Sequence, residues 1–230
     1  CLSWPIDLAG EKMRIFAAFV VVLLLTSGCL RAEEIESNFH GELIAPNVKV
    51  DDFTLFESDD GLWNYSEETE GKVTVIAFLF TNCLDICPIV TSNLHWMYNQ
   101  LTPEEHNLTQ FITITVDPWR DDAQTMSDWK LYRGTEWPHL TANSTEEDSQ
   151  MYQTMMSVWF NFEVGLFIEA PDDNETSNNT SARHHPDAYS VNHSTGTVIV
   201  DRFGEQRVWW GDNDWVLDLF LTDLRYLIEL

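Results

Sequence analysis

The sequence predicts an α/β sandwich: a central β-sheet flanked by helices, with a β-hairpin on its N-terminal side. Short runs rich in β-branched and aromatic residues recur along the chain, and segments with apolar residues at helical spacing stand between them. This alternation is typical of helices packed on the faces of a sheet. At 230 residues, 44% of them hydrophobic, the chain can form a sizeable core, and no internal repeat is visible.

The strands are predicted from two patterns. Residues 53–65 (FTLFESDDGLWNY) alternate apolar and polar side chains around Asp60-Gly61, which is typical of a β-hairpin. Continuous apolar runs, typical of buried strands, occupy residues 72–80 (KVTVIAFLF) and 111–116 (FITITV). Further strands are expected at residues 158–167 and at 197–201 (TVIVD), the latter followed by a turn at Phe203-Gly204.

The helices are predicted from apolar spacing and from their first residues. One helix is expected from Pro88 onward, because proline suits the first turn and Ile89, Leu94, Met97 and Leu101 follow at helical spacing. A second is expected after a capping Asp122. The expected helices cover residues 88–101, 122–132, 146–157 and 214–230.

The N-terminal segment predicts export and membrane attachment. Lys12-Met13-Arg14 precedes the apolar run 15–25, which is too short to span a bilayer but normal for a signal peptide, and small residues then lead to Cys29. We expect a mis-called start at 1–12 and a signal peptide with a lipobox-like Cys29, or an uncleaved membrane anchor, at 13–29. A polar tether is expected at 30–48 and the folded domain at 49–230. Either anchor would hold the domain at the cell membrane, on its extracytoplasmic face.

The charge balance argues against nucleic acid as a partner. The formal net charge is −26, from 38 Asp and Glu against 12 Lys and Arg, whereas phosphate binding needs clustered cations. The acidic residues are spread in short groups, which favours a solvated surface. An acidic docking face for a basic partner stays open.

Two of the four cysteines stand apart from the others. Cys1 precedes the expected start and Cys29 belongs to the anchor, so the mature domain holds only Cys83 and Cys87. A small exported domain stapled by disulfides would show four or more cysteines. A purely structural role is therefore the weaker interpretation of this pair.

The surroundings of the pair predict a redox or metal site. A strand that ends in Cys-x-x-x-Cys-Pro and turns into a helix places both sulfurs at a helix N-terminus, which favours thiolates. Thiolates select Cu(I), Zn(II) or iron–sulfur centres, but two do not complete a structural zinc site. A third ligand is needed, and His193 precedes a strand where a loop could bring it over the cysteines.

The other candidate ligands are weaker. His95 is expected to be a packed or surface residue of the helix that follows Cys87, and the methionines of MYQTMM are expected to pack in the core. His184 and His185 lie in a polar loop and could gather metal adventitiously. Three further histidines have no supporting context: His40, His106 and His139.

Four segments carry a resemblance to a known family. FLFTNCLDICPIV, ITVDPWRD, LTANSTEE and YSVNHSTGTVIVDRFG occur in this order, and the resemblance that they carry runs from about Phe53 to Asp201. They resemble the SCO/SenC family of membrane-anchored, thioredoxin-like proteins, which help to assemble copper sites in cytochrome c oxidase. The resemblance implies a thioredoxin-like sandwich, copper as Cu(I) or Cu(II), and an acceptor such as oxidase subunit II or another cuproprotein.

The resemblance also implies roles for individual residues. Cys83, Cys87 and His193 match the family's copper ligands. Two positions depart from the family pattern: Leu84 replaces a common proline, and Asn192 replaces the usual aspartate, which can alter how His193 is oriented. Residues expected beside the metal or facing a partner are Asp85, Pro88, Asp117 and Asn192.

Four functions are open to this sequence. The leading hypothesis is a copper-binding assembly factor with a three-coordinate Cu(I) site. The alternative is a thiol–disulfide oxidoreductase in which Cys83 attacks and Cys87 resolves, and which does not need His193. A peroxiredoxin is disfavoured because Thr81 is two residues before Cys83 rather than three. A zinc enzyme lacks an evident general base.

Overall fold

The computed structural model describes residues 38–169, 189–194, 196–213 and 215–230. The expected mis-called start, signal peptide and Cys29, together with His184 and His185, lie outside the described residues. Within the described ranges, no helix combines the length and the apolar character needed to cross a bilayer. Residues Phe39–Leu230 form one compact unit.

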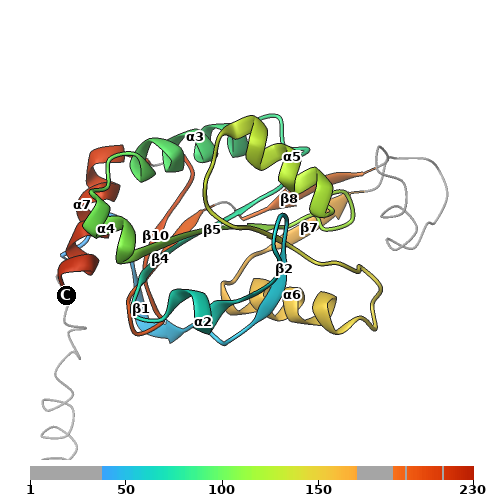
Figure 1. Cartoon of the computed structure of the whole chain (residues 1–230), viewed down its shortest axis with the longest axis horizontal. Coiled ribbons are helices and arrows are strands. Elements are labelled where there is room, and N and C mark those ends of the chain that lie inside the picture. The colour runs from blue at the N-terminus through green and yellow to red at the C-terminus, as the bar shows by residue number, and fades with distance from the viewer. Residues whose placement is uncertain (1–37, 170–188, 195, 214) are drawn as a thin grey trace, which may run out of the picture. The chain divides into compact units, whose positions relative to one another are not determined.

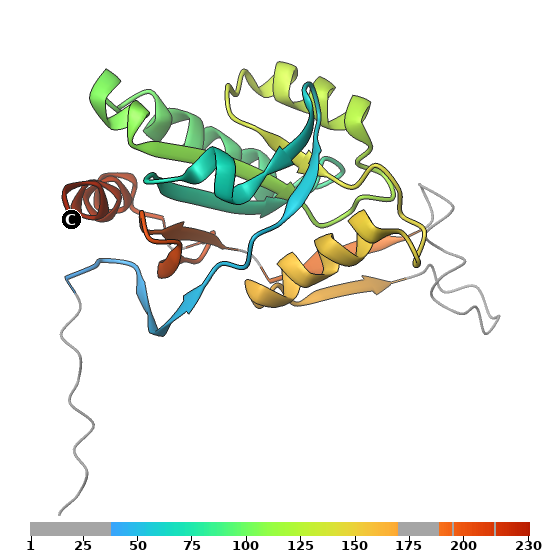
Figure 2. The same ribbon diagram turned by 60° about the horizontal axis from the view of Figure 1, so that its bottom comes forward.

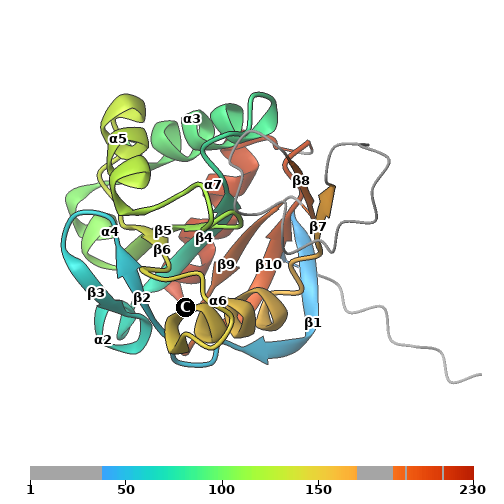
Figure 3. The same cartoon turned by 90° about the vertical axis from the view of Figure 1, so that its right-hand side faces the viewer.

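A mixed eight-stranded sheet forms the centre of this unit (Figure 1). Its strand order is β1-β10-β9-β4-β5-β6-β2-β3, and a separate two-stranded sheet pairs β7 with β8. Figure 3 shows β1 at one side of the sheet and β3 at the other. The strands are β1 (Glu42–Lys49), β2 (Thr54–Glu57), β3 (Gly61–Asn64), β4 (Val73–Leu79), β5 (Thr109–Thr115), β6 (His139–Thr141), β7 (Leu166–Glu169), β8 (Ser190–His193), β9 (Thr197–Val200) and β10 (Glu205–Trp210).

Strand β4 is the hydrophobic centre of the sheet. All seven of its residues are buried, and it pairs in parallel with β5 on one side and antiparallel with β9 on the other. Burial of each large aliphatic side chain contributes about 1.5–3 kcal/mol relative to exposure. The apolar run that predicted this strand therefore also explains its central position, and the prediction is confirmed.

Helices cover both faces of the sheet. Helices α3 and α5 lie on one face and α6 on the other, as Figures 1 and 2 agree. Helix α7 packs against α3 and β4. This arrangement confirms the predicted α/β sandwich. The helices are α2 (Tyr65–Thr69), α3 (Ile86–Tyr98), α4 (Pro103–Asn107), α5 (Ala123–Arg133), α6 (Gln150–Asn161) and α7 (Leu217–Glu229).

Helix α5 shows how local residues set an element's ends. The Asp122 carboxylate accepts the Thr125 N–H at 2.8 Å and so satisfies one free donor of the first turn. Gly134 ends the helix in the left-handed conformation, at φ 67°, which glycine adopts without a Cβ penalty. The predicted start at Asp122 is confirmed.

The predicted β-hairpin is also confirmed, and its turn has a defined internal partner. Strands β2 and β3 pair antiparallel with Phe56 opposite Leu62. A carboxylate oxygen of the buried Glu57 accepts the N–H groups of Asp59 at 2.8 Å and Asp60 at 2.7 Å. Lys130 of α5 binds this turn through Glu57 at 3.2 Å and Asp59 at 2.7 Å, so the hairpin is tied to the helix above it.

Two sequence-based boundaries were wrong. Residues 42–48, assigned to the polar tether, form most of β1, which pairs antiparallel with β10 at the edge of the sheet. An edge strand has a neighbour on one side alone, and β1 has no buried residue, so its exposed, mixed composition resembles a linker. Residues 158–161, predicted as a strand, belong to α6 instead. The β-favouring pair Val158-Trp159 is buried there on one face of the helix, so packing decides the structure.

Asp223 of α7 fixes the chain just before β1. This carboxylate, only 1% exposed, accepts the His40 N–H at 2.9 Å, the Gly41 N–H at 2.9 Å and the Trp210 indole N–H at 3.1 Å. We call these residues the N-terminal join. Every donor that faces Asp223 here makes a bond, so the join is a fully satisfied structural site.

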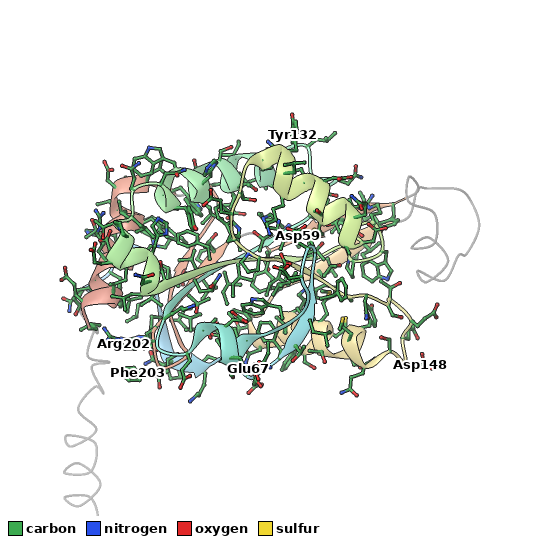
Figure 4. All side chains as sticks on the ribbon, viewed as in Figure 1. Asp59, Glu67, Tyr132, Asp148, Arg202 and Phe203 are labelled. Carbon is green, nitrogen blue, oxygen red and sulfur yellow. The ribbon has the colours of Figure 1, made fainter. Side chains whose placement is uncertain are left out.

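The acidic surface is dispersed over the unit. Figure 4 shows Glu67 and Asp148 at its periphery, on α2 and before α6. Both are exposed. A solvated acidic surface and an acidic docking face both fit this distribution.

Candidate metal centre

The strand directions bring the two cysteines and His193 to the same edge of the sheet. Strands β4 and β10 both run antiparallel to β9, and Thr197 at the start of β9 pairs with Ala77 on one side and with Trp210 on the other. The segments that follow β4 and β10, and the one that precedes β9, therefore meet at one edge. We call this region the cysteine edge and define it by Phe80–Cys87, Val116–Asp121, His193 and Asp212.

The two cysteines lie at the start of α3 as free thiols. Cys83 is 8% exposed and Cys87 is 0% exposed. The Cys83 sulfur accepts the Cys87 N–H at 3.3 Å. Asp85, at the N-cap position, makes no capping bond with its side chain, so the Cys83 sulfur takes the place of the usual N-cap oxygen.

This geometry makes the two thiols unequal. Hydrogen bonds from the Cys87 thiol and then from the amides of Cys87, Asp85 and Ile86 lower the pKa of Cys83 to about 6. The same thiol–thiol hydrogen bond, together with burial, raises the pKa of Cys87. Cys83 is thus the thiolate and the more accessible sulfur of the pair, and Cys87 is the protonated, deeper one.

His193 presents one free nitrogen to the interior. It ends β8, opposite Leu166 of β7. Its Nδ1 lies 2.8 Å from the Ser194 carbonyl oxygen, which can only accept, so Nδ1 carries the proton and Nε2 the lone pair. Nε2 is buried without a hydrogen-bond partner. Burial lowers the pKa of His193 and so favours the neutral ring that binds metals.

The imidazole packs beside the segment that leads into the cysteines. The His193 ring meets the Phe80 ring edge to face, with 5.7 Å between ring centroids. Phe80 directly precedes the turn, and its carbonyl accepts the Cys83 N–H at 3.4 Å. The structure therefore places His193 next to the cysteine segment, although 110 residues separate Cys83 from His193 in the sequence.

A buried ion pair holds the strand that carries His193. The Tyr189 hydroxyl, just before β8, donates to the Asp117 carboxylate at 2.5 Å. Arg120 pairs with Asp117, donates to the Tyr189 carbonyl at 3.1 Å and lies 4.0 Å above the Tyr189 ring. Burial raises the pKa of Asp117, while Tyr189 and Arg120 oppose this rise. Asp117 thus lies at the cysteine edge and positions β8 through Tyr189.

A second buried carboxyl holds the cysteine turn. Asp121 accepts the Thr81 N–H at 3.1 Å and the Thr81 hydroxyl at 2.5 Å, and Thr115 donates to it at 2.5 Å. Burial raises its pKa to about 7, and these hydrogen bonds counter part of the rise. Asp121 is therefore a fully used structural group beside the site.

Asp212 is a third buried carboxyl at this edge, and its hydrogen-bonding capacity is unused. It is 4% exposed, and neither carboxylate oxygen has a hydrogen-bond partner. Burial raises the pKa of Asp212 to about 7. The nearby Trp215 indole opposes this rise, although its N–H makes no bond of normal geometry, and the Cys83 charge adds to it.

The structure brings these groups to one edge without closing them on an ion. Among the described residues, no three His, Cys, Asp or Glu side chains lie close enough together to hold a metal ion as they stand. A three-ligand site would require movement of these side chains toward one another. Two positions expected to face a metal or partner, Asp85 and Asn192, have exposed side chains, and Pro88 is half-buried.

The remaining histidines and methionines have structural surroundings where they are described. His95 lies edge-on to the Trp137 ring, and His106 packs against Tyr98. His139 is fully buried, stacked on Trp137 and bonded to the Thr135 hydroxyl at 2.9 Å. Of the three methionines of α6, Met155 is fully buried, Met151 is half-buried and Met156 is 43% exposed.

Sequence reasoning missed three contributors to this edge: Tyr189, Asp121 and Asp212. Asp121 belongs to ITVDPWRD, a segment that was noted for Asp117 alone. Tyr189 begins YSVNHSTGTVIVDRFG, a segment that was quoted for His193 alone, and its role is visible only in its hydrogen bond to Asp117. Asp212 stands in loop sequence two residues after β10, and only the sheet topology identifies it.

Comparisons with known proteins agree with this architecture. The family model described as SCO1/SenC matches residues 42–214. A SCO2-like protein of Rickettsia felis is 26% identical over 160 residues, which cover 69% of this chain and 68% of that protein. Curated relatives are matched over 39% to 68% of their own length.

Solved structures show the same fold. Apo Sco1 from Thermus thermophilus gives a TM-score of 0.62 at 22% identity and covers 84% of this chain and 99% of its own. Yeast Sco1 with copper bound gives a TM-score of 0.60 at 20% identity, and the match covers 80% of this chain and 90% of the yeast chain. The thioredoxin-like sandwich implied by the resemblance is thus confirmed. Since the family model matches well over half of the chain, this protein belongs to the SCO1/SenC family.

Proposed function

We propose that this protein binds copper through Cys83, Cys87 and His193 and passes it to another copper protein. One observation carries the proposal. Two free thiols and a buried imidazole nitrogen without a hydrogen-bond partner lie at the same edge of the sheet. Relatives with the same fold include a Sco1 with copper bound.

The donors suit Cu(I) in softness and charge. Two thiolates and a neutral imidazole are the ligand types that favour Cu(I) over hard cations. The Cys83 sulfur is already a thiolate near neutral pH because its pKa is lowered to about 6. Copper binding would replace the proton of Cys87, whose raised pKa makes metal uptake release a proton.

His193 is the ligand best placed to leave during transfer. The cysteines share one helix start, whereas His193 comes from the separate β7-β8 sheet. Loss of this one ligand would open copper to a donor from the acceptor and leave both sulfurs in place. We therefore propose transfer by ligand exchange that begins at His193.

The proposal extends to the protein that accepts the copper and to the cellular location of the domain. The SCO/SenC resemblance points to the copper site of cytochrome c oxidase, in subunit II, as the destination or as the site to be prepared. The segment 13–29 and Cys29 point to a domain held on the extracytoplasmic face of the cell membrane. Attachment to the membrane would place the copper site near a membrane-bound acceptor.

A Cu(I) titration tests the proposal. The full chain in detergent, carrying Cys1→Ser and Cys29→Ser so that Cys83 and Cys87 are the only thiols, is reduced and competed with a chromophoric Cu(I) chelator. We expect one-to-one binding that weakens roughly tenfold or more in His193→Ala. The control His40→Ala removes an exposed imidazole whose described contact is through its backbone N–H alone. Binding that His193→Ala leaves unchanged would refute the three-ligand site.

The unequal thiols also support thiol–disulfide exchange as a second candidate function. The Cys83 thiolate would attack an acceptor disulfide and release one acceptor thiolate. Cys87 would then lose its proton, attack Cys83 and release the second, leaving Cys83 and Cys87 as a disulfide and the acceptor reduced. This reaction does not involve His193, so exchange rates equal in His193→Ala and the parent chain would assign it to the cysteines alone.

A further inference from the structure

Asp212 differs from the other two buried carboxyls of the cysteine edge. Asp117 is bound by Tyr189 and Arg120, and Asp121 by Thr81 and Thr115. Asp212 is equally buried, but both of its oxygens lack hydrogen-bond partners. Burying a carboxyl without partners is costly, so its position calls for an explanation.

The sheet topology places Asp212 beside the cysteines. It lies two residues after β10, and Trp210 and Ala77 pair with opposite sides of Thr197. Trp210, the last residue of β10, and Ala77, near the end of β4, are therefore two strand spacings apart, about 9.5 Å. Both sulfurs interact with this carboxyl: its charge raises the pKa of Cys87, and the charge of Cys83 raises its own.

We propose that Asp212 supplies a fourth, oxygen donor that lets this site hold a divalent cation such as Cu(II), Co(II) or Zn(II) in addition to Cu(I). This inference rests on the proposed Cys83, Cys87 and His193 site. Divalent ions of this class favour four ligands and accept carboxylate oxygen, whereas Cu(I) is satisfied by the soft donors alone. Because no three of these side chains lie close enough to hold an ion as they stand, Asp212 and the other three donors would have to move toward a common centre.

The net charge of the metal and its ligands also supports a role for Asp212 in the divalent form. Two thiolates and a neutral imidazole carry −2, so they leave a net −1 around Cu(I). Adding the carboxylate to a divalent ion gives the same net −1. The site would thus keep one overall charge for both oxidation states of copper, with Asp212 as a ligand in the divalent form alone.

Cobalt(II) is the probe that tests this role. Its visible bands report the number and type of ligands, and it does not oxidise thiolates. The reduced full chain with Cys1→Ser and Cys29→Ser is titrated anaerobically with Co(II) and, separately, with Cu(I). Asp212→Asn removes the carboxylate at nearly constant volume. The control Asp148→Asn removes an exposed carboxylate before α6 (Figure 4).

We expect Asp212→Asn to weaken Co(II) binding roughly tenfold or more and to shift the cobalt bands, while Cu(I) affinity stays within about threefold of the parent chain. Thermal unfolding of the metal-free variant should match or exceed that of the parent, because an unpaired carboxyl has been removed. This would exclude misfolding as the cause.

Two results would overturn the proposal: Co(II) affinity and bands equal to those of Asp148→Asn, or an equal loss of Cu(I) and Co(II) affinity in Asp212→Asn. Failure of the parent chain to bind Cu(I) would count against the proposed function instead. In that case the cobalt comparison would still decide whether Asp212 is a ligand.

Discussion

Two buried carboxyls near the end of β10 show opposite use of the same chemical group. Asp223, at the N-terminal join, accepts N–H groups of His40, Gly41 and Trp210. Asp212, at the cysteine edge, accepts none, although it is also almost fully buried. The first carboxyl ties the chain together, whereas the second leaves acceptor capacity unused beside two thiols.

The difference separates buried polar groups whose hydrogen-bonding capacity is used from buried polar groups whose capacity is free. A satisfied buried carboxylate contributes to stability because its donors would otherwise be unpaired. An unsatisfied one costs stability, and a cation is one partner that could repay this cost. His193 belongs to the second kind through Nε2. The predictions below follow from this contrast.

The largest expected effect is on metal binding by Cys83→Ser. A serine hydroxyl stays protonated near neutral pH and is a hard donor, so Cu(I) affinity should fall roughly a thousandfold, about 4 kcal/mol. The fold should survive, because a serine hydroxyl is close to the thiol in size and can accept the Cys87 N–H in place of the sulfur. Chelator competition with Cu(I) measures the loss. An affinity within threefold of the parent would remove Cys83 from the site.

A substitution in the N-terminal join should lower the stability of the fold rather than the affinity for metal. Asp223→Ala leaves the N–H groups of His40, Gly41 and Trp210 unpaired, which should lower the free energy of unfolding by about 3 kcal/mol. Urea denaturation of the metal-free protein measures this change. Asp212→Asn is the matched control and should leave the free energy of unfolding equal to that of the parent or raise it slightly, by less than about 0.5 kcal/mol. Equal losses in both variants would erase the contrast between the two carboxyls.

The elements predicted best were those set by local pattern. The apolar run of β4, the proline-led α3 and the alternating hairpin all depend on side chains within a few residues of each other. Strand β1 depends instead on pairing with β10, far along the chain, and carries a proline and exposed side chains. Such an edge strand has no local signal that separates it from a tether.

The residues of the candidate site also divide into those with a local sequence signal and those without one. Cys83 and Cys87 could be singled out because their spacing, the strand before them and Pro88 after them are neighbours in sequence. His193 could be proposed from its place before a strand, and the family resemblance then favoured it over the other histidines. Asp212 gave no signal at all, because its importance lies in the hydrogen bonds that it lacks and in the pairing of β9 with β10.

His139 provides a test of buried imidazoles outside the cysteine edge. Burial lowers its pKa to about 3, against about 6.5 in an unfolded chain. Between these values the unfolded chain binds more protons, so His139 lowers stability as the pH falls. From pH 7 to pH 5 the parent should lose about 2 kcal/mol more than His139→Gln, measured by urea denaturation at both values. Parallel losses would show that His139 does not titrate in this way.

The smallest effect is expected from Tyr189→Phe, which tests whether the Asp117 network positions His193. The substitution removes the hydroxyl that donates to Asp117 at 2.5 Å but keeps the ring beneath Arg120. Loss of one hydrogen bond to a charged group should cost about 1.5 kcal/mol of stability.

The looser start of β8 should also weaken Cu(I) binding, by about threefold, or roughly 0.7 kcal/mol. The control Tyr132→Phe alters an exposed tyrosine of α5 (Figure 4) and should change neither quantity. If Tyr189→Phe lowered stability but left Cu(I) affinity unchanged, Asp117 would belong with Asp223 as a purely structural carboxyl. A loss in both quantities would instead tie this network to the cysteine edge, because Tyr189 directly precedes β8, the strand that ends at His193.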